Sequence, residues 1–175
     1  MAVDELDLDR YIASFSDFPE PGILFRDVSP LLASHDGMTA AIDAFAQRLA
    51  DVKIDMVAGI ESRGFLFSTL LAAHLSVGSL MVRKPGKLPG RLVRTRYALE
   101  YGEAELAIQQ DAPIEGRSVL IVDDLLATGG TVAAAKSLLE RCGAIVTACA
   151  VVVELAGLNG RAAVGVPVVA LQSYD

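Results

Sequence analysis

Apolar residues follow two patterns along this chain. Short continuous runs rich in β-branched residues predict strands that are buried on both faces of a sheet. Runs with apolar residues three and four positions apart predict helices that cover such a sheet. The predicted strands are Asp55–Ile60, Ser79–Val82, Val119–Val122, Ala144–Val153 and Val166–Leu171. The predicted helices are Leu6–Phe15, Met38–Val52, Phe65–Leu75 and Val132–Arg141, with at most one short helix at Gly157–Arg161.

Two further segments interrupt this order. The turn Asp17–Gly22 holds two prolines and a glycine, which end any preceding helix, and Ile23–Val28 after it is extended. Val93–Glu100 and Ala104–Gln109 read as a hairpin. The remaining strands alternate with helices, which predicts an α/β fold with a mostly parallel central sheet flanked by helices. We expect a single domain over residues 1–175.

The strand Val119–Val122 ends in two carboxylates, Asp123 and Asp124, followed by the small residues Ala127–Thr131 and then a helix. Ligands of open α/β sheets lie beyond the carboxyl ends of the strands. Adjacent carboxylates suit sugar hydroxyls or hydrated Mg²⁺. The glycine-containing turn and the helix N-terminus suit a phosphate. Together they predict a site for a ribose 5-phosphate.

Two other interpretations of this stretch are weaker. The Asp-Asp strand end is similar to a Walker B strand, but no G-x-x-x-x-G-K-[ST] motif is present, and no G-x-G-x-x-G follows a strand. A plain buried strand with a polar turn would leave the paired aspartates and the Gly-Gly unexplained.

Composition narrows the class of ligand. The net charge of −7 argues against nucleic acid or an anionic membrane as the main partner. The segment Arg83–Arg96 nevertheless concentrates basic residues, which suggests a small polyanionic ligand. The length of 175 residues is enough for one domain with a sizeable core.

The remaining composition favours a cytoplasmic protein. Cys142 and Cys149 have no C-x-x-C spacing, so reduced thiols are expected. His35 and His74 stand alone and do not form a zinc site. The acidic N-terminus is not that of a signal peptide. The uncharged stretch Gly64–Val82 is interrupted by polar residues and is better explained as a buried helix and strand.

The stretch V-L-I-V-D-D-L-L-A-T-G-G-T resembles the phosphoribosyl-diphosphate (PRPP) signature of the type I phosphoribosyltransferases. The resemblance implies that family's fold. It also implies that the ribose and 5-phosphate of PRPP are bound by Asp123, Asp124, Ala127, Thr128, Gly129, Gly130 and Thr131.

Other segments are similar to one branch of that family, the adenine phosphoribosyltransferases. D-F-P-E-P-G-I-L-F-R-D-V-S-P-L-L resembles their N-terminal hood (residues 15–33), which implies adenine binding by Leu24, Phe25 and Arg26, largely through the backbone. A-G-I-E-S-R-G-F-L-F resembles their diphosphate loop. This implies diphosphate binding at Glu61, Ser62 and Arg63, with a strained or cis Glu61–Ser62 peptide. By chemistry alone, Glu61 and Arg63 simply pair on the surface.

V-R-K-P-G-K-L-P-G, followed by L-E-Y-G-E-A-E-L, resembles the flexible catalytic loop of the same branch. We call residues 83–102 the lid. The resemblance implies that Glu100 assists proton transfer at the purine and that Tyr101 packs over the closed site. It further implies that Arg83, Lys84 and Lys87 neutralise diphosphate, across the interface of a homodimer. A solvated basic loop is the structural alternative.

The resemblance implies a purine-salvage transferase that converts adenine and PRPP to AMP and diphosphate. Mg²⁺ is expected with PRPP, held mainly by the diphosphate and not directly by the protein. Related 6-oxopurine enzymes have a lysine where this chain has Glu154 and Leu155, which disfavours hypoxanthine and guanine. Two alternatives stay open: a phosphoribosyltransferase for another purine, and a PRPP-binding regulator without turnover.

Overall fold

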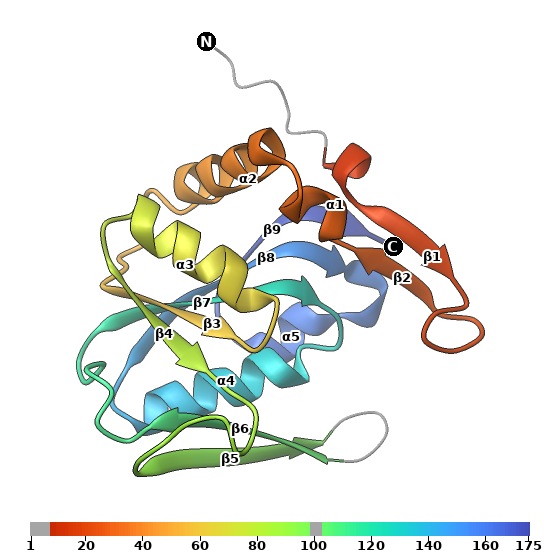
Figure 1. Ribbon diagram of the computed structural model, residues 1–175. Helices are drawn as coiled ribbons and strands as arrows, with labels where there is room; N and C mark the ends of the chain where they lie inside the picture. The colour runs from red at the N-terminus through yellow and green to blue at the C-terminus, as the bar shows by residue number, and fades with distance from the viewer. Residues whose placement is uncertain (1–7, 99–102) are drawn as a thin grey trace.

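The centre of the molecule is a five-stranded parallel sheet with the strand order β4-β3-β7-β8-β9 (Figure 1). The computed structural model describes residues 8–98 and 103–175. The five strands are β3 (Met56–Ile60), β4 (Gly78–Val82), β7 (Ser118–Leu126), β8 (Ile145–Leu155) and β9 (Val168–Tyr174). The predicted α/β fold with a mostly parallel sheet is therefore confirmed.

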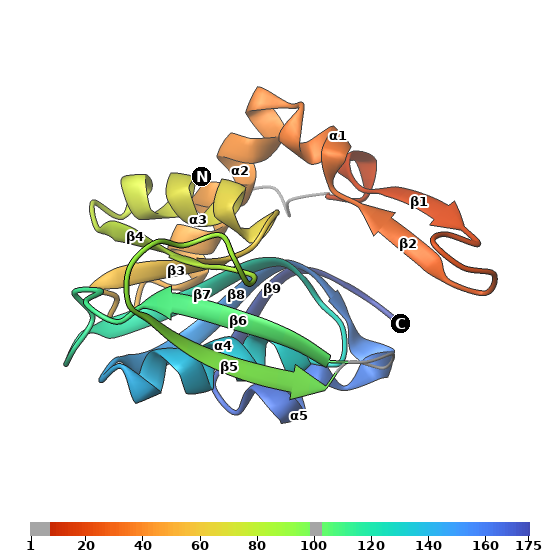
Figure 2. The same cartoon turned by 60° about the horizontal axis from the view of Figure 1, so that its bottom comes forward.

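Helices cover both faces of this sheet (Figure 2). One face carries α1 (Ser29–Leu32), α2 (His35–Arg48) and α3 (Gly64–His74); the other carries α4 (Gly130–Arg141) and α5 (Gly160–Val164). The side chains of β7 alternate between the two cores. Leu120 packs with Phe45 and Phe67 of α2 and α3, whereas Ile121 packs with Leu138 of α4. This period of two explains why the strand is apolar at every position from Val119 to Val122.

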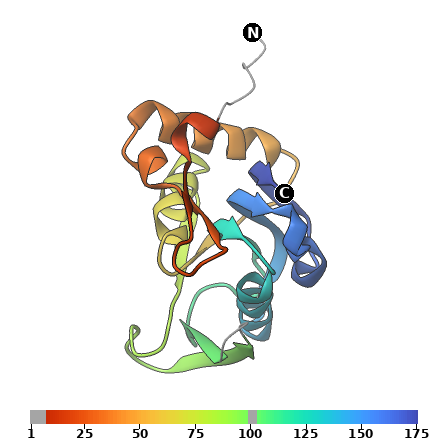
Figure 3. The same ribbon diagram turned by 90° about the vertical axis from the view of Figure 1, so that its right-hand side faces the viewer.

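Two antiparallel hairpins stand outside the sheet. One consists of β1 (Ala13–Ser16) and β2 (Leu24–Asp27), and the other of β5 (Leu92–Ala98) and β6 (Glu103–Gln109). The β1–β2 hairpin projects from the helical layer toward the edge of the sheet where the strands end (Figures 1 and 3). The β5–β6 hairpin packs against α4, and the hydrophobic core of that face includes Leu106 and Ile108.

The predicted helix Leu6–Phe15 is wrong over its described part. A 3-10 helix spans Asp9–Tyr11, with a 3-10 hydrogen bond at its end, and strand β1 follows at Ala13. The helical spacing of Leu8 and Ile12 is real, because both are buried against the α2 layer. The backbone beyond Ile12 pairs with β2 instead, and this long-range pairing outweighs a local helical preference.

The other predicted elements are present with shifted ends. The α2 helix begins at His35, where the Ser34 hydroxyl caps the Gly37 N–H at 3.1 Å, and ends at Arg48 rather than Val52. The segment predicted as one short helix at Gly157–Arg161 consists of a 3-10 turn at Ala156–Leu158 and then α5. Within the described residues, no helix is long and apolar enough to cross a membrane.

The sheet has a topological switch point between β3 and β7. From β3 the chain crosses through α3 to β4 on one side, and from β7 it crosses through α4 to β8 on the other side. The segments that follow β3 and β7 therefore diverge to opposite faces at the carboxyl edge, which is where open α/β sheets bind ligands. The predicted site residues follow these two strands.

Candidate active site

Strand β7 continues through the carboxylates instead of ending at Val122 as predicted. Its pairing with β3 stops at Val122, whereas its pairing with β8 continues to Leu126. Asp123 and Asp124 thus remain in strand β7, but beyond the point where β3 stops pairing with it. This geometry opens the edge of β7 toward the loop after β3.

Asp124 lies on this stretch of β7 and is only 5% exposed. Its Oδ2 accepts a short hydrogen bond from Nε of Arg63, which begins the loop-to-helix transition after β3. The structure therefore joins the predicted ribose and diphosphate positions by an ion pair. The alternative interpretation of the sequence, in which Arg63 pairs with Glu61 on the surface, is therefore wrong.

Asp123 is adjacent and differs in its electrostatics. Its Oδ1 accepts the backbone N–H of Asp124 at 2.9 Å. Burial raises the pKa of Asp123 well above the usual aspartate value, and the negative charge of Asp124 raises it further. The raised pKa of Asp123 favours its protonated form more than in a free aspartate, which suits a position between anionic groups.

The loop Ala127–Gly129 and the N-terminus of α4 line a cavity of about 150 Å³ directly beyond the strand. Gly129 takes a left-handed conformation, with φ of 83°, as the residue before the helix. The first N–H groups of an α-helix lack partners within the helix and carry its positive dipole end. The cavity that includes Thr128, Gly130 and Thr131 thus has the form of an anion cradle.

The hydroxyl of Thr131 connects this cradle to the β5–β6 hairpin. Thr131 Oγ1 donates to the Tyr97 hydroxyl at 3.3 Å, and at the other end of α4 Arg141 donates to the Arg94 carbonyl at 2.9 Å. Strand β5 of the hairpin is thereby hydrogen-bonded to both ends of α4. Tyr97 was not predicted as a site residue, because nothing in the local sequence pattern relates it to the phosphate loop.

The loop after β3 has the cis Glu61–Ser62 peptide that the resemblance implied. Gly64 lies directly behind it, where an added Cβ would be 2.7 Å from the Val122 carbonyl oxygen and 3.0 Å from Asp123 Oδ1. Only a residue without a side chain lets this loop approach the end of β7 so closely. The predicted diphosphate loop and the predicted ribose site are therefore in van der Waals contact.

Glu61 itself binds the beginning of the lid. Its carboxylate accepts from Arg83 Nε at 3.2 Å and from the Lys84 N–H at 2.9 Å. Burial opposes ionisation of this group, but the hydrogen bonds from Lys84 and Arg83 outweigh it and lower the pKa of Glu61. The side chain of Arg83 is thus committed to Glu61, whereas Lys84 and Lys87 are exposed.

The β1–β2 hairpin brings Phe25 to the same edge. The Arg63 guanidinium lies 6.0 Å from the centre of the Phe25 ring, and the Phe18 ring packs edge-on against Phe25 at 5.1 Å. Arg26 points elsewhere. Its guanidinium stacks 3.7 Å from the ring centre of Tyr174 and donates to Ser14 Oγ at 2.5 Å. Leu24 is exposed on the hairpin.

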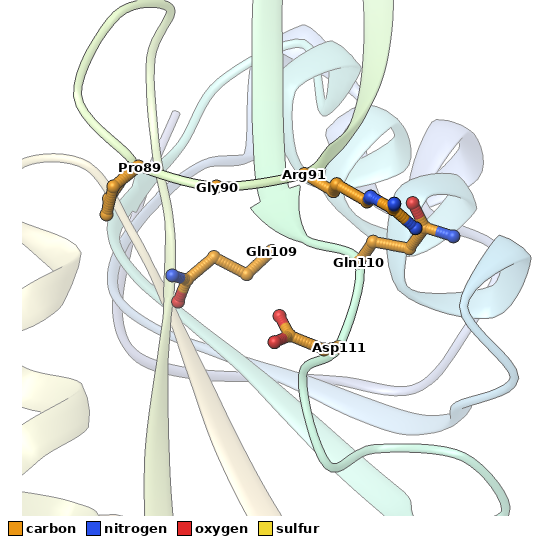
Figure 4. A pocket seen from close by; sticks show the side chains of 6 residues that line it. All are labelled: Pro89, Gly90, Arg91, Gln109, Gln110 and Asp111. Atoms are coloured by element: carbon orange, nitrogen blue, oxygen red, sulfur yellow. The ribbon is translucent and has the colours of Figure 1, made fainter.

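Arg63 consequently joins three of the predicted groups: the carboxylates, the diphosphate loop and the hood. The predicted Glu100 and Tyr101 lie outside the described residues. Another cavity, of about 460 Å³, lies away from these residues. It lies between the lid segment at Gly90 and the end of β6, and none of its lining residues is a predicted site residue (Figure 4).

The candidate site offers few side-chain donors for a metal ion. Among residues 8–98 and 103–175, no three His, Cys, Asp or Glu side chains gather closely enough to hold a metal ion. Asp123 and Asp124 are the acceptors beside the phosphate cradle, and Asp124 already binds Arg63. This donor set fits an ion such as Mg²⁺ that takes most of its ligands from phosphate oxygens and water.

A parallel sheet whose switch point holds a carboxylate pair, an anion cradle and a glycine-dependent second loop defines a type I phosphoribosyltransferase. Accordingly, the family model of the phosphoribosyl transferase domain matches residues 27–164. An adenine phosphoribosyltransferase of Mus pahari is 52% identical over 180 residues, covering 100% of both chains. The chain belongs to the adenine phosphoribosyltransferase family.

Solved structures agree with this assignment. The crystal structure of adenine phosphoribosyltransferase from Thermoanaerobacter pseudethanolicus has a TM-score of 0.92 and 42% identity, and the match covers 95% of this chain and 98% of that one. The Saccharomyces cerevisiae enzyme, complexed with adenine and an imino-altritol bisphosphate, has a TM-score of 0.89 and 42% identity, covering 94% of this chain and 96% of that one. The type I fold is confirmed.

Proposed function

We propose that this chain transfers the 5-phosphoribosyl group of PRPP to N9 of adenine, which yields AMP and diphosphate. The observation that carries the proposal is the position of Arg63 between Asp124 and Phe25. Through it, a ribose site, a diphosphate loop and an aromatic hood meet at one edge of the sheet. The relatives named above, adenine phosphoribosyltransferases at 42–52% identity, support adenine as the base.

The binding roles follow from the chemistry of each group. Asp123 and Asp124 accept hydrogen bonds from the ribose hydroxyls. The backbone N–H groups of residues 127–131 bind the 5-phosphate, whose binding energy orients the ribose. Arg63 uses Nε for Asp124, so its other guanidinium nitrogens face the diphosphate with Ser62. Phe25 stacks on adenine, and the backbone groups of Leu24 and Arg26 form hydrogen bonds with the edge of the adenine ring.

The reaction builds charge in two places. Carbon C1 of the ribose becomes oxocarbenium-like while negative charge collects on the departing diphosphate. Mg²⁺ bound with PRPP neutralises part of that charge. Lys84 and Lys87 of the lid supply the rest, and Glu61 fixes the start of the lid through Lys84 and Arg83. Glu100 takes part in proton transfer at the purine, Tyr101 covers the site, and closure of residues 83–102 excludes water.

The end of β8 supports a preference for adenine over 6-oxopurines. Glu154 and Leu155 stand where related 6-oxopurine enzymes carry a lysine, and the Glu154 carboxylate is bound by Arg161 at 2.6 Å. No ammonium group is therefore available there for a purine O6. We expect hypoxanthine and guanine to be poor substrates.

The chain acts as a homodimer in this proposal. Helix α3 contains no Asp, Glu, Lys or Arg, and its residues Leu66 and Leu70, one turn apart, are 48% and 47% exposed. On the neighbouring edge strand β4, Met81 is 49% exposed. Such an apolar surface over α3 and β4 suits a second copy of the chain. The proposal places the enzyme in the cytoplasm, where its two cysteines stay reduced.

One assay tests the activity. Purified protein is incubated with PRPP, Mg²⁺ and adenine, hypoxanthine, guanine or xanthine in turn, and nucleotide formation is followed by chromatography. We expect AMP from adenine and little product from the other bases. Nucleotide from another base at a higher rate would contradict the base assignment, and no nucleotide from any base would contradict the transferase.

A further inference from the structure

The phosphate loop rests on α5 through backbone contacts. A Cβ added to Gly160 would lie 2.2 Å from the Ala127 carbonyl oxygen, and one added to Gly129 would lie 2.4 Å from the Gly160 carbonyl oxygen. Both distances are shorter than any van der Waals contact, so glycine is required on each side. The backbone of the loop Ala127–Gly129 thus packs directly against the first turn of α5.

Helix α5 is too short to be a rigid support by itself. It has five residues, and it lies between left-handed residues at Asn159, with φ of 52°, and Gly165, with φ of 68°. Isolated helices of this length are not stable, because nucleation fixes several residues for each hydrogen bond gained. Its position must come from contacts with the rest of the protein.

Val164 of α5 is buried in the hydrophobic core, and Arg161 supplies the polar contacts. Its Nε and Nη2 donate to the two carboxylate oxygens of Glu154, each at 2.6 Å, and its Nη1 donates to the Val168 carbonyl at 2.7 Å. Glu154 lies near the end of β8 and is only 6% exposed, and Val168 begins β9. A bidentate arginine–carboxylate pair fixes orientation as well as distance. Arg161 therefore ties α5 to two strands of the central sheet.

We propose that Arg161 and Glu154 are positioning residues for the 5-phosphate of the substrate. They hold α5 so that its Gly160 backbone supports Ala127 and Gly129, and this support sets the direction of the loop N–H groups. All three nitrogens of the guanidinium are committed within the protein, so Arg161 acts on the phosphate through the loop. The inference deepens the proposed function and depends on the loop being the phosphate site.

The test compares ligands that differ only in the 5-phosphate. The dissociation constants of AMP and adenosine are measured by calorimetry for the wild type, Arg161→Ala and Arg161→Lys. We expect Arg161→Ala to reduce the preference for AMP over adenosine by about 10- to 100-fold, as misplacement of a binding group by about 1 Å does. Adenosine affinity should stay within about twofold, because it depends on the hood and the carboxylates.

Two comparisons separate positioning from general stability. Arg161→Lys restores a single charged hydrogen bond and should recover part of the AMP preference. Arg48→Ala is the matched control, because Arg48 likewise ties a helix to β9 through a carbonyl, that of Ala170 at 2.6 Å, but on the α2 side of the sheet. This control should lower the melting temperature and leave the AMP preference unchanged. In steady state, the KM for PRPP should rise in Arg161→Ala far more than the KM for adenine.

The outcomes are distinguishable. If wild type binds AMP and adenosine equally, the loop is not the phosphate site and the proposed function fails with it. If wild type prefers AMP and Arg161→Ala keeps that preference, only the positioning role is overturned. Should Arg161→Ala not fold, Glu154→Gln provides the same measurement, since it weakens the pair while it keeps the shape of the side chain.

Discussion

Replacing Gly129 by alanine tests the phosphate loop most directly. The residue has φ of 83°, where an L-residue with a side chain costs about 1–2 kcal/mol. The new Cβ would also lie 2.4 Å from the Gly160 carbonyl oxygen, in a contact that must widen. Forcing an extra carbon into a packed contact costs about 1–3 kcal/mol. The two effects together predict a loss of roughly 2–5 kcal/mol in the free energy of unfolding.

Gly116→Ala is the matched control. Gly116 also has positive φ, of 69°, but no atom lies within 4 Å of its added Cβ. This variant should show the backbone effect alone, about 1–2 kcal/mol. Urea unfolding followed by circular dichroism gives both values, and their difference isolates the contact between the loop and α5. Calorimetric titration with AMP should show weakened binding for Gly129→Ala and wild-type binding for Gly116→Ala.

One result would refute this reasoning. If the two variants lose the same stability and bind AMP equally well, the phosphate loop does not depend on close packing against Gly160. The distances on which the positioning role of Arg161 depends would then have no energetic consequence. A loss of AMP binding without extra destabilisation would instead mean that the loop yields locally and α5 stays in place.

Three further predictions concern other parts of the site. Glu100→Gln should lower kcat by about 10²- to 10⁴-fold while the dissociation constant of PRPP stays near wild type, which single-turnover kinetics and titration can check. Asp123→Asn should raise the melting temperature at pH 8. The raised pKa of Asp123 means that the folded wild type loses stability as pH rises past the ordinary aspartate value, so the difference between variant and wild type should vanish below that value. Tyr174→Ala should raise the KM for adenine more than the KM for PRPP. Tyr174→Phe keeps a ring beneath Arg26 and should have a smaller effect. If the two variants have the same KM for adenine, Tyr174 has no role in the hood through its ring.

The parallel sheet was predictable because its signal is local. The strand Val119–Val122 is apolar at every position, and it is followed by a helix with its own spacing. The loops at Arg63 and Gly129 could be assigned to one edge by topology alone, since the carboxyl ends of parallel strands meet there. The phosphate was assigned to the Gly129 loop from its residue chemistry and the diphosphate to the Arg63 loop by resemblance, and both assignments stay predictions.

The failures all involve distant partners. Strand β7 was expected to end at Val122, because consecutive carboxylates do not fit a buried strand. They fit here since Asp124 meets Arg63, 61 residues earlier in the chain. The N-terminal segment was misread because β1 is defined by its pairing with β2 and not by its own residues. Likewise, the link Tyr97–Thr131 joins residues 34 positions apart whose local sequence carries no sign of the connection.

The long-range pair of Asp124 and Arg63 also resolves an electrostatic difficulty in the site. Two ionised carboxylates lying about 5 Å from a phosphate charge would each oppose it by roughly 3 kcal/mol at an effective dielectric constant of about 20. In this protein Asp124 is countered by the guanidinium of Arg63, and the raised pKa of Asp123 favours its neutral form. The acidic pair can therefore face ribose hydroxyls while phosphate and diphosphate occupy the loops on either side. Arg63 thus makes the aspartates compatible with an anionic substrate, so that Arg63→Ala should impair ribose 5-phosphate binding as well as diphosphate binding.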